Sequence, residues 1–187
     1  KIVIFSFELS NMNRLSQSFN IIFTLLLGTL LGGCASTTKK DVQYGLIQFH
    51  LEARPDGSPR TSNVPIFRAS PIYISIETDP ILDVGYVSEA SITEHLGSYE
   101  IAIQFDETGT RRLETITTVN RGRRLAIFAR FMNDEIEHAR WLGAPVIDQT
   151  IKDGRLSFTP DATREETQQL IDGLNAAAEE IKKPYVF

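Results

Sequence analysis

Apolar and polar residues alternate along several stretches of the chain, a pattern that predicts β-strands with one buried face. The clearest strand covers residues 99–105, and the same alternation predicts strands at 42–51 and 71–77. Residues 64–67 predict a short edge strand, because a proline within it cannot donate to a ladder. Residues 124–131, RLAIFARF, are apolar on both faces for most of their length. This last stretch predicts a central strand covered on both sides.

Apolar residues at three- and four-residue spacing predict two longer helices. The first follows Asp106, a good N-cap, and ends at Gly122, a residue free to adopt positive φ. The second has Thr159 as its N-cap and runs to about Lys183. Residues 81–90 predict a short third helix.

Two further segments complete the expected architecture. The charged stretch 132–143 predicts a loop, and residues 146–151 and 155–158 predict the arms of a hairpin. The expected fold class is α+β: a ferredoxin-like sandwich, with a mainly antiparallel sheet and two or three helices packed on one face.

A different pattern stands near the start of the chain, where residues 19–31 carry no charge. The run suits the apolar part of an export signal and is shorter than the ~20 residues that span a bilayer. It ends in Leu31-Gly32-Gly33-Cys34. Small residues let an extended backbone enter a peptidase cleft, leucine fills an apolar pocket, and a cysteine thiolate can accept a lipid. The alternative is a short buried helix followed by a structural cysteine.

The segment resembles the lipobox of bacterial lipoproteins. The resemblance implies a signal peptide at 1–33 and a lipidated tether at 34–41 attached to a membrane through Cys34. The remaining residues, 42–187, are enough for a single domain with its own core and too few for two ordinary domains. Several acyl chains would anchor the protein stably. Alanine at position 35, in place of aspartate, implies the outer membrane, with the domain facing the periplasm. Met12 begins an ordinary signal peptide, so we expect it as an alternative start of translation.

Composition narrows the chemistry of the domain. Cys34 is the single cysteine, so a disulfide or a cysteine zinc cluster within one chain is excluded. The net charge of −5 disfavours nucleic acid as a partner. The three histidines, His50, His95 and His138, share no metal-ligand spacing. No serine lies in a Gly-x-Ser-x-Gly elbow, so we expect no catalytic residue, metal or cofactor.

Two polar segments allow competing interpretations. Asp134, Glu135, Glu137 and His138 offer possible cation ligands, but a polar loop does not aim them at one point, which favours a solvated loop. The basic residues of 121–124, with Arg111 and Arg112, suit a carboxylate, a phosphate or a glycan. A solvated helix end, where cations complement the helix dipole, is the favoured interpretation.

An ordered series of residues resembles a known family. The series comprises Phe105-Asp106-Glu107-Thr108-Gly109, Leu113, Thr117, Asn120, Gly122, Leu125-Ala126-Ile127, Ala144-Pro145-Val146-Ile147, Ile151, Gly154, Phe158-Thr159 and the helix from Glu165 to Leu174. Over residues 71–180 it is similar to the head subdomain of the first periplasmic domain of SecD and SecDF. The resemblance implies a ferredoxin-like unit without catalytic residues that contacts exported polypeptides. The chain departs from the family in a longer segment at 132–143, where the family has a tight turn, and in Asp153, which replaces a turn glycine.

These observations lead to a principal hypothesis and two alternatives. The principal hypothesis is a lipid-anchored, non-enzymatic envelope module that binds a polypeptide or a protein partner. Its expected contact region includes Phe131, Met132 and Trp141, because aromatic residues on loops often anchor interfaces. Trp141 folded back over the core is the competing interpretation. The alternative functions are a structural lipoprotein of an outer-membrane assembly and an envelope hydrolase with carboxylates gathered in a cleft.

Overall fold

The computed structural model describes residues 45–95, 97–133 and 136–183. All of them belong to one compact unit, Asp41–Phe187. The predicted lipobox and Cys34 lie outside the described residues.

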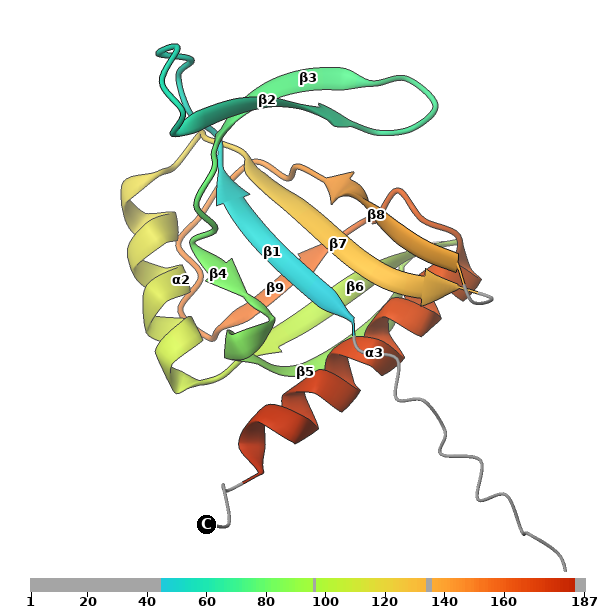
Figure 1. Cartoon of the computed structure of the whole chain (residues 1–187). Helices are drawn as coiled ribbons and strands as arrows, with labels where there is room; N and C mark the ends of the chain where they lie inside the picture. Colours follow the sequence, from blue (N-terminus) through green and yellow to red (C-terminus); the bar gives the residue numbers. More distant parts are fainter. Residues whose placement is uncertain (1–44, 96, 134–135, 184–187) are drawn as a thin grey trace, which may run out of the picture. The chain divides into compact units, whose positions relative to one another are not determined.

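The largest sheet has four antiparallel strands in the order β4-β1-β7-β8 (Figure 1). Their bounds are Leu82–Asp83, Leu46–Leu51, Leu125–Asn133 and Ile136–Gly143. The predicted central strand, β7, is covered on both faces. Ile127 on one face belongs to the main core, and Ala126 on the other packs beneath a separate hairpin. This double burial explains why the strand reads as an almost continuous apolar run.

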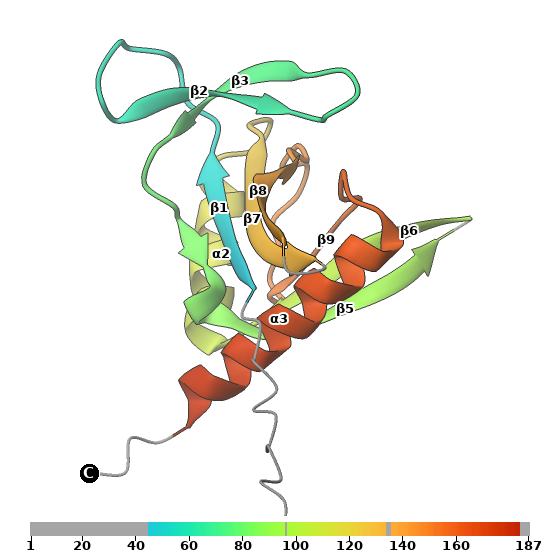
Figure 2. The ribbon, with the colours of Figure 1, turned by 45° about the vertical axis from the view of Figure 1, so that its right-hand side comes forward.

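Two smaller antiparallel sheets complete the β-structure. One has the order β5-β6-β9, with bounds Val87–His95, Ser98–Phe105 and Arg155–Phe158. The other is a hairpin of β2 (Thr61–Ile66) and β3 (Ile72–Glu77). The hairpin lies across the end of the four-stranded sheet, as both ribbon views show (Figures 1 and 2). It buries Val64 and Ile74 there.

Helix α2 (Glu107–Val119) begins where the sequence predicts it. Asp106 caps it by accepting a hydrogen bond from the backbone N–H of Gly109 at 2.6 Å. Gly122, with φ +82°, follows its end. A short 3-10 helix, η2 (Val84–Tyr86), precedes β5.

Helix α3 (Arg164–Lys182) packs against β5, β7 and β1 (Figure 2). Its buried residues Leu170, Ile171 and Leu174 join strands of both larger sheets in one core. The two described helices and the antiparallel pairing confirm the predicted α+β class.

Four predictions about single elements were wrong. Residues 81–90 form β4, η2 and the start of β5 in place of a helix, because β5 pairs with β6 along its length. Within the predicted loop at 132–143, residues 132–133 are the end of β7 and residues 136–143 are the whole of β8. An edge strand accommodates charged side chains because part of it faces solvent.

The other two errors concern the end of the chain. Residues 146–151 form no hairpin arm: the segment bonds to the residues before β7, with Ile147 N–H donating to the Arg123 carbonyl at 2.9 Å. The N-cap of α3 is Thr163, four residues beyond the predicted Thr159. Thr163 forms a complete capping box with Glu166, and this reciprocal pair of hydrogen bonds fixes the start of the helix.

Candidate functional site

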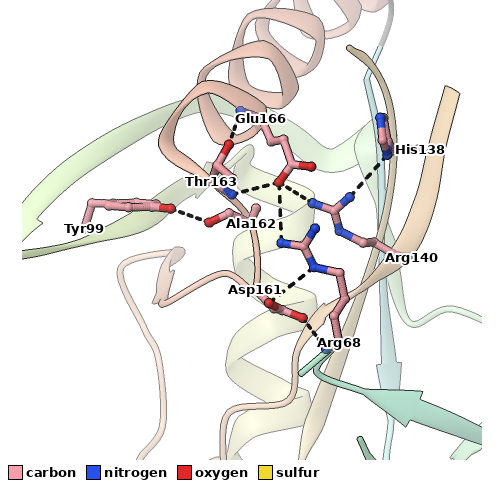
Figure 3. A network of polar contacts seen from close by, with 8 residues as sticks. All are labelled: Arg68, Tyr99, His138, Arg140, Asp161, Ala162, Thr163 and Glu166. Atoms are coloured by element: carbon pink, nitrogen blue, oxygen red, sulfur yellow. Dashed lines mark hydrogen bonds and ion pairs between the residues drawn. The ribbon is translucent and has the colours of Figure 1, made fainter. Parts of the chain in front are cut away.

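A cluster of polar side chains, which we call the Glu166 cluster, joins three elements at the N-terminal end of α3. It comprises Arg68, His138, Arg140, Asp161, Thr163 and Glu166 (Figure 3). The hairpin supplies Arg68, β8 supplies His138 and Arg140, and the segment before α3 and its first turn supply the rest. The cluster therefore fixes the hairpin and the edge of the large sheet to the helix.

The carboxylate of Glu166 is the centre of the cluster. Its side chain is 8% exposed, and its Oε2 lies 2.6 Å from Nη2 of Arg140 and 3.6 Å from Nη2 of Arg68. The backbone N–H of Thr163 donates to the same oxygen at 2.8 Å. Burial alone would raise the pKa of Glu166. The hydrogen bonds from Thr163 and Arg140 and the charges of both arginines outweigh burial, so this pKa is lowered overall.

Arg140 is held on several sides, and its own side chain is 15% exposed. Its guanidinium lies over the ring of Phe131, 5.2 Å from the ring centroid. Its Nη1 is 3.4 Å from Nδ1 of His138, whose ring stacks on Phe131 at 5.5 Å. Because the carboxylates of Glu166 and Asp161 each pair with an arginine from another element, the arrangement of the cluster suits holding these elements together.

Arg68 ties the tip of the hairpin to this cluster. Its backbone N–H donates to Oδ2 of Asp161 at 2.6 Å, and its Nε is 3.5 Å from Oδ1 of the same carboxylate. The preceding residue, Phe67, has φ +69° and is 42% exposed. Positive φ in a bulky residue is a genuine outlier. The contacts of Arg68 hold the backbone in this strained conformation.

Phe67 lines a groove, which we call the tip groove. The groove has a volume of about 590 Å³, and its other sides are formed by Glu100, residues 143–145 and residues 157–161. It lies where the edge strands of the two larger sheets end, since β8 ends at Gly143 and β9 at Phe158. The two ends are in contact, because a Cβ added to Gly143 would lie 3.5 Å from the Thr159 carbonyl oxygen and 3.7 Å from Phe158.

The predicted contact residues occupy the β7–β8 hairpin in different environments. Phe131 is 2% exposed and belongs to the main core. Met132 is half-buried. Trp141 is also half-buried, packs on the small core beneath the hairpin and meets the His50 ring edge-on at 5.3 Å. The predicted alternative, in which Trp141 folds back over the core, agrees with this position.

Other residues considered from the sequence are dispersed. Among the described residues, no group of three or more histidine, cysteine, aspartate or glutamate side chains could hold a metal ion. In the basic group, Arg123 bonds to Glu52 and Glu77, whereas Arg111 pairs with Glu107 along α2. Both arginines therefore have partners within the protein. None of the described helices is long and apolar enough to cross a membrane.

Sequence reasoning missed Phe67, Arg68 and Glu166. The Thr-x-x-Glu spacing of a capping box at Thr163 was a usable signal for Glu166. Nothing in the sequence pairs Arg68 with Asp161, which lies 93 residues further along.

The fold defines an α+β domain in which the Glu166 cluster joins the hairpin, the edge of the large sheet and α3. The family model of the SecDF P1 head subdomain matches residues 62–178, which is more than half of the chain. The chain therefore belongs to the SecDF P1 head family. The resemblance to the head subdomain of SecD and SecDF, which the sequence predicted, is confirmed.

Solved structures of SecDF share the fold. One, of a membrane component SecDF that enhances protein export, is 18% identical with a TM-score of 0.50, covering 72% of this chain and 64% of that chain. Another, of SecDF in a super-membrane-facing form, has the same identity and TM-score but is covered over 19% of its length. The chain thus spans less than two thirds of either protein. No curated protein matches the chain.

Proposed function

We propose that this protein is a lipid-anchored, non-enzymatic module of the bacterial envelope that contacts polypeptides during export. The observation that carries the proposal is the match to the SecDF P1 head over residues 62–178. The similar structure described as SecDF is a component that enhances protein export. The predicted signal peptide and lipidation site, Leu31-Gly32-Gly33-Cys34, support a lipid anchor, and Ala35 supports a place on the outer membrane facing the periplasm.

The β7–β8 hairpin is the proposed contact region. Strand β8 is an edge strand of the four-stranded sheet, so one of its two sides pairs with no other described strand. An extended polypeptide can add to such an edge through backbone hydrogen bonds, which require no particular sequence. Near the end of the strand the Leu142 carbonyl already accepts from Asp161 N–H at 2.7 Å, so the open part begins at Ile136, whose side chain is 62% exposed. Trp141 lies on β8 itself with its ring against Phe128 and His50, Met132 lies on β7 opposite Glu137, and buried Phe131 supports the pair of strands.

Photocrosslinking in living cells tests the contact. A photoreactive residue in place of Ile136 is expected to crosslink to newly exported polypeptides. A matched control carries the same residue in place of Val119, which is 74% exposed on α2. Equal labelling from both positions, or none from position 136, would contradict the proposed contact region.

The anchor has its own test. Cys34→Ala is expected to abolish incorporation of a labelled fatty acid and to release the protein from the membrane fraction, since the thiol is the acylated group. Ser36→Ala, two residues further on, is the control and should retain both properties. Membrane retention of the Cys34→Ala protein would contradict lipid anchoring.

A further inference from the structure

The tip groove combines an aromatic side chain at its opening with backbone strain beside it. Strained backbone persists where the surrounding structure enforces it, and it concentrates at binding and switching sites. Here the strain at Phe67 keeps a large apolar ring 42% exposed next to the groove. A glycine or an asparagine would occupy this backbone conformation at lower cost. Local stability therefore does not explain a phenylalanine at this position.

The interior of the groove suits an apolar side chain. Pro145, Phe158 and Pro160 line it together with Phe67, and its volume of about 590 Å³ falls in the range of ligand sites. Phe158 and Pro160 are themselves buried, so this part of the lining is fixed by the core. A preformed apolar site binds at low entropic cost.

The charged residues around the groove determine which residues of a ligand are favoured next to that apolar side chain. Two carboxylates, Glu100 and Asp161, line the groove. Asp161 is neutralised by Arg68 at 3.5 Å, whereas Glu100 makes no ion pair with any residue that the structure describes. The groove therefore has one unbalanced negative charge beside an apolar surface.

We propose that the tip groove binds an extended polypeptide segment in which a large apolar residue is followed closely by lysine or arginine. The apolar side chain packs between Phe67 and Phe158, and the cation lies near Glu100. This inference rests on the proposed function and assigns it a side-chain preference and a second contact surface, apart from the β8 edge. A second copy of this chain fits less well, because each copy has a net charge of −5 and would bring another unbalanced Glu100.

Fluorescence anisotropy with labelled peptides and the purified full-length protein in detergent tests the preference. The first probe is a short extended peptide with one phenylalanine next to lysine. The second probe has glutamate in place of lysine, and the third has serine in place of phenylalanine. The first peptide is expected to bind most tightly, and each change should weaken binding by about threefold to tenfold.

Variants of the protein locate the binding site. Phe67→Asn keeps a residue that tolerates positive φ but removes the ring, and should weaken binding of the first peptide by about tenfold. Glu100→Gln should weaken it by about threefold and abolish the preference over the glutamate peptide. The control is Tyr73→Asn, which removes a 72% exposed aromatic ring of the same hairpin that does not line the groove. Circular dichroism confirms that each variant is folded.

Three outcomes would overturn the proposal: equal affinity for all three peptides, unchanged binding by Phe67→Asn, or concentration-dependent dimers that the Phe67 variant abolishes. Crosslinking from two positions distinguishes a failure of the groove proposal from a failure of the proposed function. Exported polypeptides that crosslink from position 136 but never from position 67 would retain the proposed function and exclude the groove. Absence of crosslinks from both positions would exclude both.

Discussion

The carboxylate of Glu166 connects elements that are distant in the sequence. Through Arg140 it holds strand β8, and through Arg68 it holds the tip of the β2–β3 hairpin. Because Arg140 is largely buried, removing the charge that faces it leaves an uncompensated cation in a region of low dielectric constant. A single carboxylate thus contributes both to helix capping and to the packing of two sheets.

Glu166→Gln is expected to lower the free energy of unfolding by about 2–3 kcal/mol. Glutamine can still accept the capping hydrogen bond from Thr163. The decrease in the free energy of unfolding therefore comes from the lost ion pairs and not from the cap. Urea denaturation measures the change. Glu165→Gln, on the exposed side of the same helical turn, is the control and should stay within about 0.5 kcal/mol of the wild type. Equal stability of the two variants would contradict a structural role for the buried carboxylate.

The lowered pKa of Glu166 has a consequence for acid stability. A carboxyl group whose pKa is lower in the folded state than in the unfolded state stabilises the protein fully above its unfolded pKa, about 4.3 for glutamate. This contribution is lost as the pH falls through the folded pKa. The stability difference between wild type and Glu166→Gln should therefore shrink below about pH 4 in urea titrations at several pH values. A difference that stays constant down to strongly acidic pH would show that ionisation of this group is not involved.

At the scale of elements, the start of α3 is a place where the structure differs from the sequence prediction. Thr159-Pro160-Asp161 looks like a helix start, yet the helix begins only after Thr163. Thr163→Ala should cost about 1 kcal/mol, because the backbone N–H of Glu166 loses its acceptor. Thr159→Ala, at the exposed predicted cap, should change stability by less than about 0.5 kcal/mol. Thermal unfolding of the two variants measures this difference, and the reverse order would contradict the observed cap.

Elements whose burial follows a regular period are among those that the sequence predicted correctly. Strand β6 and helix α2 each bury one face, so alternation and helical spacing suffice to recognise them. Strand β8 was missed because its exposed positions include Ile136 and Glu137 at its start, which hides any alternation. Its strand character comes from pairing with β7, a contact between neighbours that only the folded hairpin reveals.

The candidate site was less predictable than the fold for a related reason. Arg68 and Glu166 are separated by most of the domain, and each alone reads as an ordinary surface charge. Phe67 follows strand β2 directly and looks like its continuation, whereas its positive φ turns the chain out of the strand. The tip groove arises from the meeting of three sheets, so no local pattern encodes it.

At the scale of the whole molecule, the described residues form two hydrophobic clusters of unequal size. The larger cluster joins β1, β6, β7, β9 and both helices. The smaller one lies beneath the β2–β3 hairpin and contains Val64, Ile66, Ile74 and Ile76 with two alanines. Regions with fewer buried apolar contacts open at lower free energy than the main core. The hairpin is therefore the part of the described domain that should open first.

Native-state hydrogen exchange tests this order. Amides of β2 and β3 should exchange faster than those of β1 and β7. Asp161→Ala removes the carboxylate that accepts from the Arg68 N–H and pairs with its side chain, so hairpin exchange should accelerate by about tenfold while exchange from the main core stays nearly unchanged. Asp172→Ala, exposed on α3, is the control and should leave the hairpin as it is. Uniform acceleration across both clusters would show that hairpin and core unfold as one unit, in which case the contacts of Arg68 would contribute to global stability and not to the position of Phe67 beside the groove.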